Sequence, residues 1–278
     1  MADRRTRFHD LFRTRRPIIG MISLPPLPGC AGAPPLPDVI AAALADLEAL
    51  QRGGADGVLV ENDFDRPHQL TVGPEIVAAM TRVTDAVVGR AAVPVGVQVL
   101  LNDWRASIAV AAASQAHFVR LDFFVDRVRI AAGVIEPEPE AVLVYRAALG
   151  AAHLAIFADI QVKYSTLLEE GKPLARSALQ AAEHGADAVV VTGSATGIAP
   201  AAEDLAAARA GGIPVLIGSG LTGANAPALL PHADGAIVGT ALRSGGGPFD
   251  RVAAGLVRDL ISASERLRSA GDRAQPGD

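Results

Sequence analysis

The sequence contains one cysteine, few aromatic residues and no long apolar run, and each shortage excludes a class of protein. A lone cysteine, Cys30, excludes an internal disulfide and a cysteine-based metal cluster, so we expect a reducing compartment such as the cytoplasm. No apolar run reaches the roughly 18 residues that a membrane-spanning helix requires. Aromatic residues make up 4% of the chain, so small aliphatic side chains must fill most of its core.

An excess of positive charge is also lacking, because the formal net charge is -5. Nucleic acid is therefore not the expected partner, since binding it requires a basic face. The exception is residues 1–16, which carry Arg4, Arg5, Arg7, Arg13, Arg15 and Arg16. No apolar core follows these charges, as it would in a secretory signal. We expect a solvated basic tail, with contact to an anionic membrane surface as the alternative.

Short β-rich runs alternate with helical stretches along the whole chain. The candidate strands are Ile18–Ile22, Gly57–Glu61, Val95–Leu100, Phe118–Asp122, Leu154–Gln161, Ala188–Thr192, Pro214–Ile217 and Gly235–Val238. The candidate helices are Pro37–Gln51, Pro74–Val87, Trp104–Ser114, Glu138–Leu149, Ala175–Glu183, Ala199–Ala210, Ala224–Leu230 and Phe249–Arg266. These strands are apolar on both faces, which is typical of parallel strands covered by helices.

This repeated pattern predicts an α/β fold, a single-domain (β/α)8 TIM barrel over residues 17–266. A barrel of this kind occupies about 250 residues. A doubly wound open sheet is the alternative, but the first strand is not followed by the G-x-G-x-x-G turn of dinucleotide-binding folds. The polar residues 267–278, which include Gly and Pro, predict a disordered C-terminal tail.

Polar residues recur at the carboxyl ends of the predicted strands, where the active sites of such barrels lie. Alternation along each strand selects the side chains that point inward together. Because buried charge is costly unless paired, we expect Arg120 to pair with one of three carboxylates, those of Glu61, Asp122 and Asp159. The expected catalytic residues are Glu61, Asp159 and Lys163, and the expected substrate-binding residues are Gln98, Asn102, Arg120, Asp122, Gln161 and Thr192.

Lys163 is distinguished by the scarcity of lysine, since the chain has two lysines among its 25 basic residues. Unlike arginine, lysine presents a compact ammonium group that can lose its proton. Lys163 could bind an anionic substrate, act as an acid or base, or form a Schiff base. The alternative is a position in a loop, paired with Glu169 or Glu170.

Glycine follows the last two predicted strands. The seventh strand ends in Gly218, Ser219, Gly220 and Leu221, and the eighth ends in Gly239, Thr240 and Ala241. Glycine lets main-chain N–H groups approach an anion closely, and the next helical turn would aim further N–H groups at the same point. Barrels often build a phosphate site from these two loops, so we predict one here. Two tight turns without a ligand are the alternative.

Metal ligands do not cluster in the sequence. His68, His117, His153 and His184 are scattered, without the spacing of a metal site. We therefore predict no metal site and no cofactor, and leave a requirement for a divalent metal open.

Five segments of this chain resemble the BtpA/SgcQ family. They are PIIGMISLPPLPG (Pro17–Gly29), ALADLEALQRGGADGVLVEND (Ala43–Asp63), PVGVQVLLND (Pro94–Asp103), ADIQVKYSTLL (Ala158–Leu168) and VLIGSGLTGANAPALLPHADGAIVGTALR (Val215–Arg243). The resemblance implies a ribulose-phosphate-binding type of barrel. The family's founding member is linked with photosystem I biogenesis as a membrane-associated factor, and other members look like sugar-catabolism proteins.

Three functions remain in view. The favoured one is an enzyme that acts on a small phosphorylated sugar or sugar-like metabolite, as an isomerase, epimerase or lyase. The resemblance implies a second, a non-enzymatic photosystem I biogenesis or assembly factor. The third is a regulator that binds a phosphorylated ligand without turning it over. The aliphatic outer helices also favour a homo-oligomer.

Overall fold

Eight parallel strands form the centre of the molecule. The structure is a computed structural model that describes residues 6–12, 14–245 and 250–272. The strands are β1 (Ile18–Ser23), β2 (Gly57–Glu61), β3 (Val95–Gln98), β4 (Phe118–Leu121), β7 (Ala155–Ile160), β9 (Ala188–Val191), β10 (Val215–Ile217) and β11 (Gly235–Val238). Each pairs with the next, and β11 closes the ring on β1. The predicted TIM barrel is confirmed, and the open sheet is wrong.

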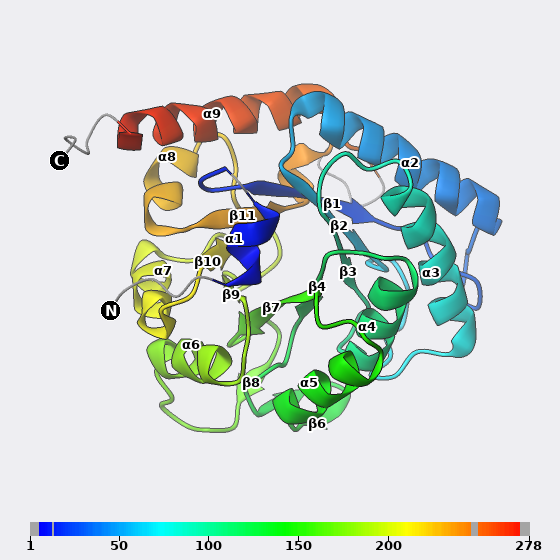
Figure 1. Ribbon diagram of the computed structural model, residues 1–278, viewed down its shortest axis with the longest axis horizontal. Coiled ribbons are helices and arrows are strands. Elements are labelled where there is room, and N and C mark those ends of the chain that lie inside the picture. The colour runs from blue at the N-terminus through cyan, green and yellow to red at the C-terminus, as the bar shows by residue number, and fades with distance from the viewer. Residues whose placement is uncertain (1–5, 13, 246–249, 273–278) are drawn as a thin grey trace.

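Helices surround this ring on all sides (Figure 1). They are α2 (Leu36–Gly53), α3 (Pro74–Val88), α4 (Trp104–Ala113), α5 (Pro139–Ala148), α6 (Leu174–Glu183), α7 (Ala202–Ala208), α8 (Ala226–Leu229) and α9 (Ala254–Asp272). Proline in the first turn of α2, α3 and α5 suits a helix start, because no intrahelical partner is lost there. Helix α9 continues to Asp272, so the first part of the predicted disordered tail is helical, and residues 273–278 lie outside the described residues.

The amino-terminal half of the barrel is filled by apolar side chains that alternate inward along the strands. Phe118 of β4 and Phe157 of β7 stack with ring centroids 4.5 Å apart. Gly96 of β3 leaves room for the Phe118 ring, since a Cβ there would lie 2.0 Å from it. Ile19, Leu59, Val190, Leu216 and Ile237 complete this inner cluster.

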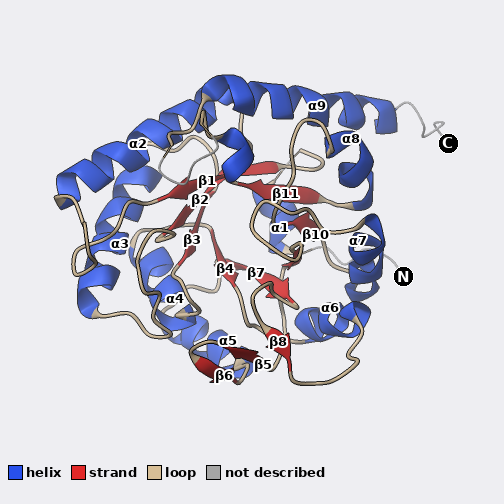
Figure 2. Cartoon of the chain, turned by 180° about the vertical axis from the view of Figure 1, so that it is seen from behind, coloured by secondary structure: helices blue, strands red, loops and turns tan. Residues whose placement is uncertain are grey.

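The first described residues, 6–12, close this end of the barrel. Helix α1 (Arg7–Leu11) lies across the ring in front of the strands in Figure 1 and behind them in Figure 2. Phe8 and Phe12 are buried, and the Phe8 ring centroid lies 5.7 Å from that of Phe157. Arg7 contacts Asp187 at 3.3 Å. The expected solvated tail is therefore wrong for this segment, because its two phenylalanines belong to the core.

A small antiparallel sheet that the sequence analysis did not predict lies at the opposite, carboxyl end of the barrel. It consists of β5 (Val128–Ile130), β6 (Gly133–Ile135) and β8 (Thr166–Leu167), in the order β6-β5-β8. Figure 2 shows it at one side of the barrel, beside α5. The sheet joins the segments that follow β4 and β7, the two strands that carry Arg120 and Asp159.

Within the described residues, no helix combines the length and the apolar character that crossing a bilayer demands.

Candidate functional site

The polar side chains of the candidate site occupy the inward positions directly above the apolar cluster. One residue separates Leu59 from Glu61, Phe118 from Arg120, and Phe157 from Asp159, so each pair shares one face of its strand. The strand register places Glu61 opposite Gln98, and Arg120 opposite Phe157. A buried polar cluster, made of Glu61, Gln98, Arg120, Asp122 and Asp159, therefore fills the mouth of the barrel.

Arg120 and Asp159 form the central ion pair of this cluster. Arg120 Nε donates to Asp159 Oδ2 at 2.7 Å, and Arg120 Nη2 donates to Asp159 Oδ1 at 2.8 Å. Burial by itself lowers the pKa of Arg120, but the Asp159 carboxylate outweighs it and raises that pKa, so the guanidinium remains charged. Of the three partners expected for Arg120, the structure selects Asp159. Both oxygens of Asp159 are thereby engaged, which suits it to orienting Arg120 rather than to exchanging protons.

Asp122 has a different environment, although it lies only two residues from Arg120. Its Oδ1 accepts a hydrogen bond of 2.7 Å from Gln98 Nε2. Burial, followed by the negative charge of Asp159, raises the pKa of Asp122 to about 7. Asp122 can therefore gain or lose a proton near neutral pH, which makes it a better acid or base than Asp159.

Glu61 is buried, with 5% of its surface exposed. Burial raises the pKa of Glu61 well above its usual range, and the neighbouring Asp63 raises it further, against the opposing charges of Arg120 and Lys163. No side chain of the described residues donates a hydrogen bond to the Glu61 carboxyl group. The raised pKa favours the protonated form of Glu61, and the described side chains supply no hydrogen-bond donor to its carboxyl group.

The side chains of Gln161 and Lys163, which both follow β7, lie in different surroundings because the backbone turns at this point. Gln161 has a φ of 47°, in the left-handed region, so the strand alternation ends there. Its Nε2 donates to the Lys172 carbonyl and to Ser177 Oγ, away from the mouth, so Gln161 is not placed to bind a substrate. Lys163 is half-buried and interacts electrostatically with Glu61 and Asp122.

The predicted alternative for Lys163, a pair with Glu169 or Glu170, is not what the structure contains. Glu169 lies 3.5 Å from the other lysine, Lys172, which also binds Asp126 at 2.8 Å. Lys163 forms no ion pair within the described ranges. Its ammonium group therefore remains available to an anionic compound in the mouth.

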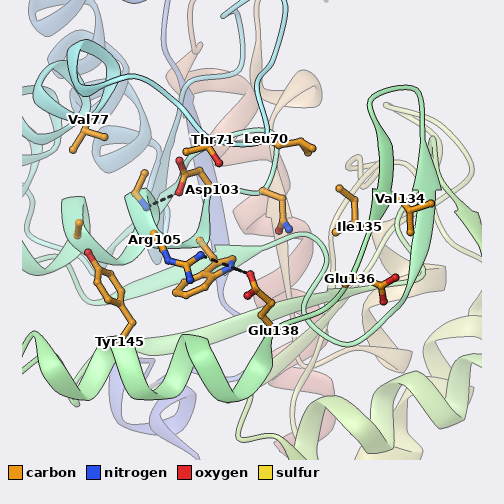
Figure 3. A pocket seen from close by; sticks show the side chains of 14 residues that line it. Leu70, Thr71, Val77, Asp103, Arg105, Val134, Ile135, Glu136, Glu138 and Tyr145 are labelled. Atoms are coloured by element: carbon orange, nitrogen blue, oxygen red, sulfur yellow. Dashed lines mark hydrogen bonds and ion pairs between the residues drawn. The ribbon is translucent and has the colours of Figure 1, made fainter.

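Asn102 lies at the edge of a different cavity. Its Oδ1 accepts a hydrogen bond of 3.2 Å from the Phe123 N–H. It lines a cavity of about 460 Å³ on the flank of the barrel, between α4, α5 and β6. Figure 3 shows Arg105, Glu138 and Tyr145 around this cavity. The Arg105 guanidinium lies 3.9 Å from the centroid of the Trp104 ring, and Trp104 Nε1 donates to Glu138. Asn102 therefore belongs to the wall between mouth and flank rather than to the centre of the mouth.

The two glycine loops predicted to bind phosphate follow β10 and β11, which are neighbours in the barrel. The Gly218 N–H already donates to the Val191 carbonyl at 2.8 Å. The N–H groups of residues 219–221 and 239–241 have no acceptor in the part of the chain that the structure describes. A Cβ at Gly218 would lie 3.4 Å from Arg120 Nη2, so the first loop passes directly beside the guanidinium.

The helical turns expected behind these loops differ from each other. The turn Thr240–Leu242 follows Gly239 at once, as predicted. Helix α8 begins only at Ala226. Between the loop and this helix, the Thr222 N–H donates to Asn225 Oδ1. The main-chain N–H groups, rather than a helix end, are therefore what the β10 loop can offer to an anion.

Ser219 connects the β10 loop to the loop after β9, in which Thr192 lies. Ser219 Oγ donates to the Ile198 carbonyl at 2.7 Å and accepts from the Gly193 N–H at 2.9 Å, so its hydroxyl is occupied while its N–H is free of an acceptor among the described residues. Thr192 Oγ1 is buried without a partner in the described ranges. An unpaired buried hydroxyl costs free energy, so Thr192 is suited to bind a ligand or a water molecule.

Two supporting polar networks were missed because their residues point away from the barrel axis. Asn62 Oδ1 accepts from the Leu100 N–H at 2.7 Å, and its Nδ2 donates to Asp65 at 2.9 Å. Asp126 receives Lys172 Nζ at 2.8 Å and Ser177 Oγ at 2.7 Å. Each network fixes loops around the mouth. The signal available in the sequence was a set of polar residues directly after a strand, as at Asn62, Asp63 and Asp65.

Metal ligands remain dispersed in the folded chain. The described residues contain no group of three or more His, Cys, Asp or Glu side chains arranged to hold a metal ion. The mouth is thus built from an arginine–carboxylate pair, two further carboxyl groups, a lysine and main-chain donors.

Comparison with known proteins places this arrangement in a family. The profile of the BtpA family matches residues 14–266, which covers the whole barrel. This chain belongs to the BtpA family. The BtpA-family chain is 38% identical over 241 residues to the photosystem I biogenesis protein BtpA of Synechocystis, covering 84% of this chain and 83% of that protein. It is 33% identical over 255 residues to an uncharacterised protein of Pyrococcus horikoshii, covering 91% and 97%.

Solved structures similar to this BtpA-family barrel share its fold at low sequence identity. The native KDPGal structure has a TM-score of 0.58 and 17% identity, covering 92% of this chain and 98% of that one. Phosphoribosyl anthranilate isomerase from Thermus thermophilus has a TM-score of 0.53 and 14% identity, covering 90% and 99%. 3-Hexulose-6-phosphate synthase has a TM-score of 0.54 and 16% identity, covering 89% and 99%. These likenesses establish the fold.

Proposed function

We propose that this chain is an enzyme that acts on a small phosphorylated sugar or sugar-like compound. The phosphate group would be held by the loops after β10 and β11, and the reacting carbons would lie over Glu61, Gln98 and Asp122. The observation that carries the proposal is the set of main-chain N–H groups at residues 219–221 and 239–241, which have no acceptor in the described residues and follow adjacent strands.

The charges of the mouth support an anionic ligand. Arg120 is charged and lies beside Gly218, and Lys163 has no ion pair among the described side chains. A phosphate bound by N–H groups at this point would gain from both cations. Two of the structurally similar proteins are named for phosphorylated compounds, which agrees with the proposal.

Isothermal titration with inorganic phosphate and with ketose and aldose phosphates tests the binding half of the proposal. Gly220→Ala should weaken binding at least about tenfold, equivalent to about 1.4 kcal/mol. Gly220 has a φ of 67°, and a Cβ there would lie 2.2 Å from the Ala199 backbone nitrogen, so the loop must move. Gly223→Ala is the matched control, because a Cβ at Gly223 meets nothing within 4 Å.

Turnover tests the catalytic half. Lys163→Ala and Glu61→Gln should lose turnover of a phosphorylated substrate while the protein still binds phosphate. Phosphate binding that is equal in wild type and Gly220→Ala would contradict the proposed site. Tight binding without turnover of any phosphorylated compound would instead favour a ligand-binding regulator.

The similarity to the photosystem I biogenesis protein supports a second candidate, an assembly factor that contacts a membrane. The basic segment is its support in this chain, but deleting residues 1–16 would also remove the buried Phe8 and Phe12. A cleaner variant replaces Arg4 and Arg5, which lie outside the described residues, with glutamine. Unchanged sedimentation of that variant with anionic vesicles would count against membrane contact through this segment.

We also propose that this chain forms a homo-oligomer. Sedimentation equilibrium of the full chain measures the mass of the assembly and so tests this expectation.

A further inference from the structure

We propose that Glu61 and Asp122 form a proton-transfer pair, one on each side of Gln98, that acts on a phosphorylated compound carrying a hydroxyl group next to a carbonyl group. This inference rests on the proposed function, which supplies the phosphate anchor. It narrows the reaction from isomerase, epimerase or lyase to the first, in which a proton moves between neighbouring carbons and no carbon–carbon bond breaks.

Three neighbouring strands create the arrangement. Glu61 ends β2, Gln98 ends β3, and Asp122 directly follows β4, and these strands lie side by side in that order. All three side chains are inward and buried, with exposed fractions of 5%, 3% and 8%. Two carboxyl groups thus flank one amide on the same wall of the mouth.

The hydrogen bonds of this wall are incomplete, which indicates that something else completes them. Gln98 Nε2 donates to Asp122, but Gln98 Oε1 is buried with no donor in the described part of the chain. Within those residues, no side chain donates to the Glu61 carboxyl group either. Buried polar groups in folded proteins are almost always paired, so the unpaired Gln98 Oε1 points to a hydroxyl-bearing ligand or an ordered water molecule that donates to it.

Asp159 and Asp63 are less suitable for proton transfer. Both oxygens of Asp159 accept hydrogen bonds from Arg120, so protonating Asp159 would break the ion pair that orients the guanidinium. Asp63 lies beyond the strand end and is more exposed than Glu61. We choose Asp122 over Asp159 because Gln98 donates to only one oxygen of Asp122, whereas Arg120 engages both oxygens of Asp159.

The pKa shifts of the two carboxyl groups suit one to donating a proton and the other to accepting one. Burial and the negative charge of Asp63 raise the pKa of Glu61 and so favour its protonated form, which can donate a proton. Asp122, with a pKa of about 7, is partly ionised at neutral pH and able to accept one. The charged groups facing the pair are Asp63, Arg120, Asp159 and Lys163, and the two cations favour the carboxylate form of Asp122.

The step balances without a cofactor. The Asp122 carboxylate removes the proton from the carbon next to the carbonyl group, and the C–H electron pair forms the carbon–carbon double bond of an enediol. The carbonyl oxygen takes the proton of the Glu61 carboxylic acid. In the second half, Asp122 delivers its proton to the former carbonyl carbon, and the Glu61 carboxylate takes the proton of the other enediol hydroxyl group, which becomes the new carbonyl group. Both residues end as they began.

Deuterium exchange tests the pair directly. The full chain is incubated in D2O with dihydroxyacetone phosphate, ribulose 5-phosphate and fructose 6-phosphate, and deuterium on carbon is followed by mass spectrometry. We expect exchange into at least one probe, and a loss of at least about 100-fold in Asp122→Asn and in Glu61→Gln, as general acid–base groups contribute on this scale. Inorganic phosphate should still bind both variants. Glu138→Gln, in the wall of the flank cavity, is the matched control and should exchange as wild type does.

The outcomes separate this inference from the proposed function. Exchange that persists in Asp122→Asn, or no exchange with any of the three probes while inorganic phosphate binds, overturns the proton-transfer pair and leaves the phosphate site in place. Failure of the wild-type chain to bind phosphate overturns both. Loss of exchange in the two variants, with phosphate binding retained, supports the pair and excludes a folding defect.

Discussion

The two ends of this barrel are built from the same strands and differ in chemistry within two residues. At the amino end, the inward positions are Leu59, Phe118 and Phe157, and α1 seals them with Phe8. At the carboxyl end, the next inward positions on those strands are Glu61, Arg120 and Asp159. The first set gains stability from apolar burial. The second set buries charge at a cost, which a fold has no structural reason to accept. The amino-terminal half of the barrel therefore maintains the fold, whereas the carboxyl-terminal half is suited to chemistry.

The largest effect is expected from breaking the ion pair of the mouth. Arg120→Met leaves the buried Asp159 carboxylate unpaired and should lower the free energy of unfolding by about 3–5 kcal/mol. Urea unfolding followed by circular dichroism measures it. The double variant Arg120→Met, Asp159→Leu should recover much of this loss, because the unpaired charge is gone. A stable single variant would contradict the pairing.

A smaller loss of stability is expected at the other end. Phe8→Ala removes an aromatic ring from the buried cluster and should cost about 3 kcal/mol in the free energy of unfolding. Phosphate binding at low temperature, where the variant is folded, should match wild type, since Phe8 lies at the opposite end of the barrel. If Phe8→Ala abolishes phosphate binding but leaves stability intact, the division between the two halves is wrong.

The pH dependence of stability sharpens the comparison. The pKa of Asp122 is raised to about 7 in the folded chain, so its protonated form stabilises the fold. This contribution is fully present below the pKa of an unfolded aspartate, roughly 4, and is lost as the pH rises through about 7. Asp122→Asn, which stays neutral, should therefore show a smaller fall in melting temperature between about pH 5 and pH 8. Identical pH profiles would show that Asp122 does not titrate in this range.

The smallest effect is expected at the rim. The Tyr164 hydroxyl accepts a hydrogen bond of 2.9 Å from the Thr196 N–H, joining the loops after β7 and β9. Because Tyr164 is 70% exposed, Tyr164→Phe should cost less than about 1 kcal/mol in stability. Hydrogen exchange at the Thr196 amide should quicken several-fold. Tyr145→Phe, on the flank cavity, is the control and should leave that amide unchanged.

Most of the barrel could be predicted because its signals are local. Apolar runs of strand length, separated by helical stretches, place all eight barrel strands within two residues of their observed ends. The alternation along β2, β4 and β7 also predicts that Glu61, Arg120 and Asp159 point inward. It fails at Gln161, where a left-handed backbone turns the side chain toward Lys172. It fails again at Asn102, because β3 ends at Gln98 and the alternation does not extend beyond it.

The segments that were missed depend on contacts between distant parts of the chain. Helix α1 is five residues long, too short to be stable alone, and it exists because Phe8 and Phe12 pack on rings from β4 and β7. Strand β8 has two residues and pairs with β5 across nearly forty positions of sequence, for which no local pattern exists.

Composition and periodicity alone specify the eightfold repeat, the apolar centre and the polar residues at the strand ends, because each depends on neighbours along a single strand or helix. Only the assembled barrel decides which of three carboxylates pairs with Arg120 and which carboxyl oxygens accept no hydrogen bond. It also decides that the β10 loop runs beside the Arg120 guanidinium. These are relations between strands, and a burial that shifts the pKa of Asp122 arises only when all of the strands have assembled around it.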